Sequence, residues 1–228
     1  RIPRSVSFIN GGAFAHCGKL ERIEVAQDNP QYHSSDNCVY HTRNKWLIIG
    51  RNDGRLPDGD FTCIFDDAFA GNTRVKELVV PRGVTSIGAA AFRDCVNLRR
   101  AVLPDTLESI GRCAFEGCAS LEEITVPCGV KNLEGMAFRK SGVKRAVIKR
   151  GVETIDDDAF GECAALCELY IPSSVKQAWS PLGLSSGENT RAVRVYIEVS
   201  DEKNYERWIE KLGGFCDVVL GCDSEIFD

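Results

Sequence analysis

The feature that most constrains this chain is a repeat of 23 residues. The pair Ala-Phe recurs along it, and from Phe69 onward successive pairs lie 23, 23, 23 and 22 residues apart. The pairs are Ala13-Phe14, Ala68-Phe69, Ala91-Phe92, Ala114-Phe115, Ala137-Phe138 and Ala159-Phe160. An aliphatic residue stands five positions before each Phe. A fixed period of this length is typical of a solenoid, in which each coil of chain buries its apolar edge only against its neighbours.

The period also accounts for part of an odd and high count of eleven cysteines in 228 residues. Three positions after each Phe stands a small residue, and we name these positions the cysteine column: Cys17, Asn72, Cys95, Cys118, Ser141 and Cys163. Because free cysteine behaves as a small buried hydrophobe, we expect this column to be packing material. Cys113 falls outside it. A disulfide between Cys216 and Cys222, on either side of the last predicted strand, would suit an extracellular protein but is not required.

The repeat unit PDTLESIGRCAFEGCASLEEITV, residues 104–126, resembles the BspA-like (bacterial surface antigen) class of leucine-rich repeat. It matches the pattern Val/Leu-x-x-Ile-Gly-x-x-Ala-Phe-x-x-Cys-x-x-Leu-x-x-Ile-x-Val-Pro, and the resemblance covers residues 1–197. It implies an α/β repeat solenoid, a right-handed superhelix with a parallel β-sheet on its concave face and mostly turns and 3₁₀ segments on its convex side. The family includes cell-surface and secreted proteins of adhesion and interaction, and it carries no catalytic motif.

Two segments depart from the repeat. Residues 26–56 break the period, and their turn-forming composition predicts one repeat enlarged by a hairpin, with Trp46–Ile49 in the sheet position. After residue 197 the sequence predicts a helix over 201–212 and a closing strand over 215–220. Because an open solenoid end exposes sheet edge and core, we expect a solenoid domain over 1–197, with about seven to eight strands, and a helix-strand cap over 198–228.

Alternation along the predicted strands sends two rows of side chains outward. The first row is Arg22, Trp46, Glu77, Arg100, Glu123, Arg145, Glu168 and Arg194, and its charge alternates in sign from Glu77 onward. Such lateral pairs stabilise the sheet and oppose a register slip. The second row, Glu24, Ile48, Val79, Val102, Thr125, Val147, Tyr170 and Tyr196, is largely apolar. Either β-branched residues simply suit strands, or this stripe is an interaction surface. The candidate binding residues are Trp46, Ile48, Val79, Val102, Thr125, Val147, Tyr170 and Tyr196, with the aromatic residues as anchors.

Other chemistry finds little support. A net charge of −5 argues against nucleic acid as a partner, and no apolar run approaches the roughly 20 residues that cross a bilayer. Cys38, His41 and His33 are fewer than the four ligands of a structural zinc site, and the acidic run 156–158 is more typical of a solvated turn than of a calcium site. We predict no metal and no cofactor.

The sequence therefore predicts a non-enzymatic binding or adhesion module that recognises a protein, or alternatively a glycan, through its concave sheet. The competing hypothesis is a structural spacer or a self-associating repeat domain without a specific ligand. The family resemblance implies a location at the cell surface or outside the cell.

Overall fold

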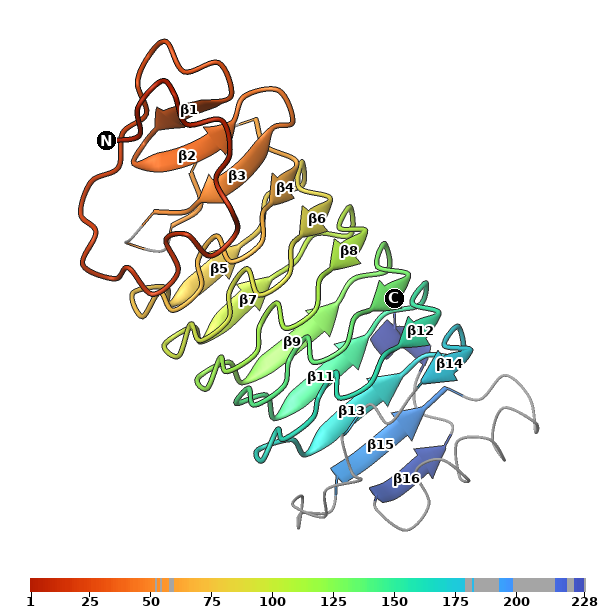
Figure 1. Ribbon diagram of the computed structural model, residues 1–228. Helices are drawn as coiled ribbons and strands as arrows, with labels where there is room; N and C mark the ends of the chain where they lie inside the picture. Colours follow the sequence, from red (N-terminus) through yellow and green to blue (C-terminus); the bar gives the residue numbers. More distant parts are fainter. Residues whose placement is uncertain are drawn as a thin grey trace.

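The computed structural model describes residues 1–51, 53, 55–57, 60–178, 182, 193–198, 216–220 and 224–227. The chain winds into a β-solenoid whose five regular coils each carry one phenylalanine of the repeat (Figure 1). Two parallel sheets run along it. Within the described residues the helical structure consists of one short 3₁₀ helix, η2 (Ser224–Phe227). The predicted α/β class is thus wrong for this part of the chain, which is all β, while the right hand and the concave face remain predictions.

The first sheet, which we call the long-strand sheet, contains the strands expected from the repeat. These are β5 (Glu77–Val79), β7 (Arg100–Val102), β9 (Glu123–Val126), β11 (Arg145–Ile148), β13 (Glu168–Ile171), β15 (Val193–Ile197) and β16 (Cys216–Leu220). β5 pairs with β7, and β9, β11, β13, β15 and β16 pair in that order, all in parallel. β7 lies beside β9, so the two blocks form one continuous surface.

The second sheet, which we call the short-strand sheet, lies where mostly turns and 3₁₀ segments were expected. Its parallel part consists of two-residue strands: β4 (Cys63–Ile64), β6 (Ser86–Ile87), β8 (Ser109–Ile110), β10 (Asn132–Leu133), β12 (Thr154–Ile155) and β14 (Gln177–Ala178). Each strand points one residue into the core and one outward, as in the fully buried Ile110 and the half-buried Ser109. Because two residues are too few for a visible alternation, the sequence pattern could not reveal this sheet.

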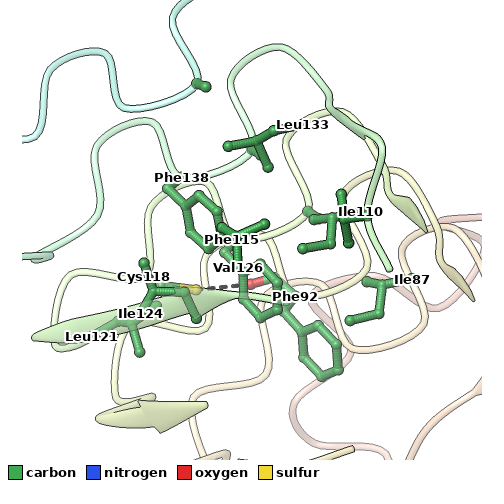
Figure 2. Close-up of a cluster of buried hydrophobic side chains, with 14 of the residues drawn as sticks. Ile87, Phe92, Ile110, Phe115, Cys118, Leu121, Ile124, Val126, Leu133 and Phe138 are labelled. Atoms are coloured by element: carbon green, nitrogen blue, oxygen red, sulfur yellow. Dashed lines mark hydrogen bonds between the residues drawn. The ribbon is translucent and has the colours of Figure 1, made fainter. Parts of the chain in front are cut away.

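Stacked phenylalanine rings form the centre of the core. Successive rings from Phe69 to Phe160 lie 5.1 to 5.3 Å apart, centroid to centroid, and are nearly parallel. The cysteine column runs beside them, as Figure 2 shows for Cys118, whose Sγ donates a hydrogen bond of 3.2 Å to the carbonyl of Phe92 in the preceding coil. Cys95 and Cys163 make the corresponding bonds to the coils before them. The prediction that this column packs the core is confirmed for these buried members, whereas Cys17, in the first coil, is exposed.

Two residues of each coil adopt left-handed backbone conformations. One directly precedes the Ala-Phe pair, where Cys113 has a φ of 57°. Its equivalents in the other regular coils are Asp67, Ala90, Met136 and Asp158. The second follows the phenylalanine by two residues and includes Gly117 (φ 72°) and Lys140 (φ 56°). Cys113 therefore belongs to a backbone corner of the coil and not to the cysteine column.

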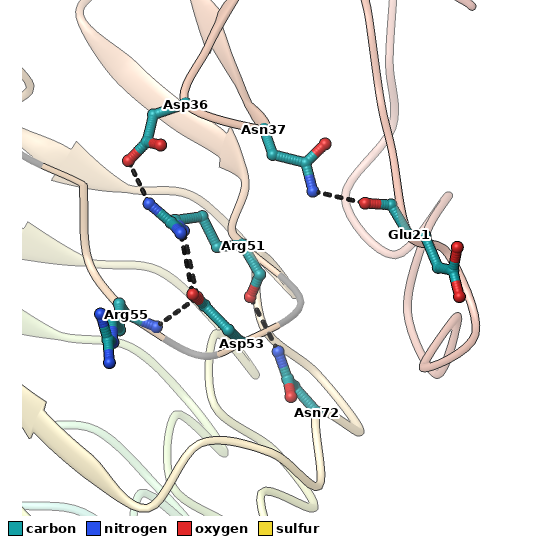
Figure 3. A network of polar contacts seen from close by, with 7 residues as sticks. All are labelled: Glu21, Asp36, Asn37, Arg51, Asp53, Arg55 and Asn72. Carbon is teal, nitrogen blue, oxygen red and sulfur yellow. Dashed lines mark hydrogen bonds and ion pairs between the residues drawn. The ribbon is translucent and has the colours of Figure 1, made fainter.

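The enlarged repeat contains the predicted hairpin but joins it to a different sheet. β1 (Tyr32–Ser35), β2 (Cys38–His41) and β3 (Trp46–Ile49) pair antiparallel, and β3 then pairs in parallel with β4 of the short-strand sheet. The prediction that Trp46–Ile49 lies in the long-strand sheet is wrong. Figure 3 shows how Arg51 ties the hairpin down, since its guanidinium binds Asp36 and Asp53 and its carbonyl accepts a hydrogen bond from Asn72.

At the other end, β16 continues the long-strand sheet in parallel with β15. The chain then returns, so that η2 lies beside β11 and the C-terminus is found alongside the middle of the solenoid (Figure 1). The helix predicted over 201–212 and the side chains of Cys216 and Cys222 lie outside the described residues. The division into a solenoid over 1–197 and a cap over 198–228 stays a prediction.

Candidate interaction surface on the long-strand sheet

The outer face of the long-strand sheet carries the predicted charged row. Strand register places Glu77 opposite Arg100, Arg145 between Glu123 and Glu168, and Arg194 beside Glu168. Arg145 Nε lies 3.4 Å from Glu168 Oε2. β16 adds Asp217 opposite Arg194, and the sequence did not predict this residue because the register of that strand was not assigned. The alternating charges compensate one another, so this row offers little net attraction to a charged ligand.

The apolar row lies on the same face and divides into an uncovered part and a covered part. Val79 is 61% exposed, Val102 is 38% exposed, and Thr125 next to them is also exposed. Val147 and Tyr170 are buried at 6% and 7%. Tyr196 is half-buried and stacks on the Tyr170 ring with a centroid distance of 4.4 Å. β16 extends this row with Val219, which lies opposite Tyr196 and is 37% exposed.

Trp46 and Ile48, the two other predicted binding residues, are not part of this row. Both belong to β3 in the short-strand sheet. The Trp46 ring stacks on Phe65 with a centroid distance of 5.1 Å, and Ile48 is 5% exposed. The prediction failed because the irregular spacing of residues 26–56 gives no information on which sheet the strand joins. The surface therefore begins at β5.

The covered part of the row is covered by the chain itself. Phe227 of η2 is 1% exposed and packs with Val147 and Tyr170, together with the half-buried Tyr196 and Ile226. Sequence reasoning missed Phe227, because a single aromatic residue after the last strand carries no periodic signal. Phe227 packs on one end of the predicted stripe, which is therefore only in part open to solvent.

Arg150 fixes Phe227 in place from the side. Its backbone N–H donates to the Phe227 carbonyl at 3.2 Å, and its guanidinium carbon lies 6.0 Å from the centre of the ring, within the range of a cation–π contact. Arg150 Nε also donates to Glu198 Oε1 at 3.1 Å, and this bond holds the pKa of that carboxyl below its usual range. The Ser173 hydroxyl donates to the same carboxylate. Aliphatic and aromatic side chains thus lie beneath the Phe227 ring, and one cation lies beside it.

The short-strand sheet has a different outer face. Its outward residues are mainly hydroxyl and amide side chains, some of which bond to each other, as Ser109 does to Ser86 at 2.8 Å. Asn132 and Gln177 on this face are exposed. A polar row of this kind suits a face that stays in water, so of the two sheets it is the long-strand sheet that exposes large apolar side chains.

The described residues hold no group of three or more His, Cys, Asp or Glu side chains placed to bind a metal ion. Burial raises the pKa of the Cys38 thiol to about 12, and His41 accepts a hydrogen bond from the Asn44 backbone. Burial also raises the pKa of Cys95 to about 12, so this thiol stays protonated and unreactive near neutral pH. Among the helices described, none has the length and apolar character to cross a membrane.

The repeat and the two-sheet solenoid identify the family. A model described as the BspA type leucine-rich repeat region matches residues 62–180 in six copies. The chain belongs to this family. No curated protein matches it.

Several solved structures share the fold. A leucine-rich cell surface protein of Faecalibacterium prausnitzii is 27% identical with a TM-score of 0.62, and the match covers 90% of this chain and 48% of that one. A leucine-rich repeat protein of Eubacterium ventriosum is 22% identical with a TM-score of 0.61, over 80% of this chain and 57% of that one. The pneumococcal vaccine antigen PcpA is 18% identical with a TM-score of 0.62, over 97% and 55%. The chain thus spans about half the length of these relatives.

Proposed function

We propose that this chain is a non-enzymatic binding module of a bacterial surface or secreted protein, and that it recognises a protein partner through the outer face of its long-strand sheet. The contact surface centres on Val79, Val102 and Thr125. Two observations support the proposal. The chain belongs to the BspA-type leucine-rich repeat family, and a cell-surface protein is among its structural neighbours. The adjacent Val79 and Val102 are exposed on the long-strand sheet, whereas the outer face of the short-strand sheet is mainly polar.

A protein fits this surface better than a glycan. Aliphatic side chains between charged ones resemble the apolar centre and polar rim of a protein interface. Sugars usually bind against aromatic rings, and the aromatic residues of the row, Tyr170 and Tyr196, lie at its covered end. The charged row beside the valines sets the orientation of a partner more than the strength of its binding.

The test is a pair of matched double variants. Val79→Lys with Val102→Lys introduces two cations into the proposed surface, and Asn132→Lys with Gln177→Lys introduces two at exposed positions of the short-strand sheet. Secreted and surface proteins of a bacterial or host culture are passed over each immobilised variant, after circular dichroism has verified the fold. We expect a partner that binds the wild type and the control and loses at least tenfold in affinity for the valine variant.

Two results would contradict the proposal. A partner that binds all three forms equally would use another face. If the immobilised chain retained a defined glycan and no protein, the partner would be a glycan and not a protein. Sedimentation of the same variants tests the competing hypothesis, since a wild-type dimer that dissociates only on Val79→Lys and Val102→Lys indicates self-association through this face.

A further inference from the structure

We propose that the pocket around Phe227 is a second binding site, for a phenylalanine-bearing segment of a partner protein, and that residues 224–227 occupy it as an exchangeable intramolecular ligand. The inference deepens the proposed function, because it concerns the covered end of the same sheet and gives the partner class there. It is independent of Val79 and Val102.

The pocket has the parts that recognise one aromatic side chain and its backbone. Val147 and Tyr170 form the floor, and these two outward-facing side chains pack against Phe227 of the tail. The guanidinium carbon of Arg145 lies over the Tyr170 ring, 4.9 Å from its centroid, and this contact helps to orient the ring. Arg150 supplies the cationic wall and the N–H that binds the phenylalanine carbonyl. An aromatic residue in a desolvated pocket beside arginine is the usual composition of a binding hot spot.

The occupant is one short 3₁₀ turn that lies on the sheet beside β11. In this turn of four residues Phe227 is fully buried, Ile226 is half-buried and Glu225 is exposed. Isolated 3₁₀ turns have poor hydrogen-bond geometry and little stability of their own. The turn is not part of the parallel ladder formed by β11, β13 and β15. It can therefore leave without opening the phenylalanine stack, and a partner's phenylalanine can take its place on Val147 and Tyr170.

Tethering makes the tail a strong competitor. Because the tail is covalently joined to β16, its local concentration at the pocket is of about millimolar order, so a free peptide should bind the wild-type chain poorly and a chain without the Phe227 ring well. The probe is a fluorescein-labelled peptide with the sequence of residues 223–228, DSEIFD, and its control is the same peptide with alanine in place of phenylalanine. The proteins are the full chain, Phe227→Ala, and Phe8→Ala, which removes a 75% exposed ring elsewhere.

We expect Phe227→Ala to bind the phenylalanine peptide at least tenfold more tightly than the wild type or Phe8→Ala. The alanine peptide should not bind, and adding Val147→Glu to Phe227→Ala should abolish binding. If Phe227→Ala binds the peptide no better than the wild type, the inference is wrong. Neither result bears on the valine surface, so the two proposals fail separately.

Hydrogen exchange on the wild type provides a test that needs no variant. The Arg150 N–H bonds to Phe227, whereas the N–H of the preceding Lys149 bonds to Val126 within the sheet at 2.9 Å. An exchangeable tail predicts that the Arg150 amide exchanges at least tenfold faster than the Lys149 amide. Equal protection of the two amides would show that the tail is a permanent part of the core and would overturn the inference.

Discussion

Replacing one ring of the phenylalanine stack measures how much the stacking itself contributes to stability. Phe115 is fully buried and stacks on two rings, Phe92 and Phe138, at 5.3 Å each. Phe69 is 3% exposed and, among the described residues, stacks on one ring, Phe92, at 5.1 Å. The substitutions Phe115→Leu and Phe69→Leu remove two and one stacked contacts while keeping most of the apolar volume.

The expected magnitude follows from the number of contacts. An aromatic pair contributes about 0.5–1.5 kcal/mol beyond its buried area, so Phe115→Leu should lose about 1–3 kcal/mol from stacking and Phe69→Leu about half of that. Both replacements share the cost of a changed shape, about 1 kcal/mol, which cancels in the difference. Phe115→Ala, which also leaves a cavity, should cost about 3–5 kcal/mol.

Urea unfolding followed by circular dichroism gives the free energies, provided that the transitions stay single and equally steep. Coils of a solenoid can differ in local stability, so Ile110→Val and Ile64→Val serve as a positional control. Both isoleucines are fully buried, and they lie in the coils of Phe115 and Phe69 respectively. Equal costs for the two valine variants, with Phe69→Leu as costly as Phe115→Leu, would refute the idea that stacking adds to burial.

Three further predictions concern the cysteine column, a backbone corner and the close approach of Gly50 to the phenylalanine stack. The thiol of Cys95 has a pKa of about 12 in the fold and about 9.0 when unfolded, so the unfolding free energy should fall as pH rises from 9 to 12, by about 1.4 kcal/mol per pH unit and thiol. Urea unfolding at pH 8 and 10.5 should show a smaller fall in unfolding free energy for Cys95→Ser than for the wild type. An equal fall in the two proteins would contradict this. Lys140 has a φ of 56° where an equivalent coil has Gly117, so Lys140→Gly should raise the unfolding free energy by about 0.5–1 kcal/mol, and thermal unfolding at a lower temperature than the wild type would count against it. A Cβ at Gly50 would lie 2.0 Å from the Phe69 ring, so Gly50→Ala should lower the unfolding free energy by about 1–3 kcal/mol in thermal unfolding. An unchanged unfolding free energy would contradict this, because it would mean that the Phe69 ring moves aside without cost.

The sequence alone was enough to predict the solenoid, its period and the inward residues of the long strands. These follow from a local rule repeated many times, since each coil must present its Phe, its aliphatic residues and its small column residue at the same place for the next coil to cover them. The charged row of Glu77, Arg100 and their successors could be predicted for the same reason, because strand alternation and a constant period fix the register.

Only the tertiary structure decided the features that depend on contacts between unlike segments. The packing of an irregular insertion on the first regular coil decides which sheet β3 joins. It thereby excludes Trp46 and Ile48 from the candidate surface. The cover that η2 places on Val147 and Tyr170 depends on a return of the chain across the sheet. A repeat specifies contacts between equivalent positions one period apart, and neither of these contacts joins equivalent positions, so no periodic pattern could encode them.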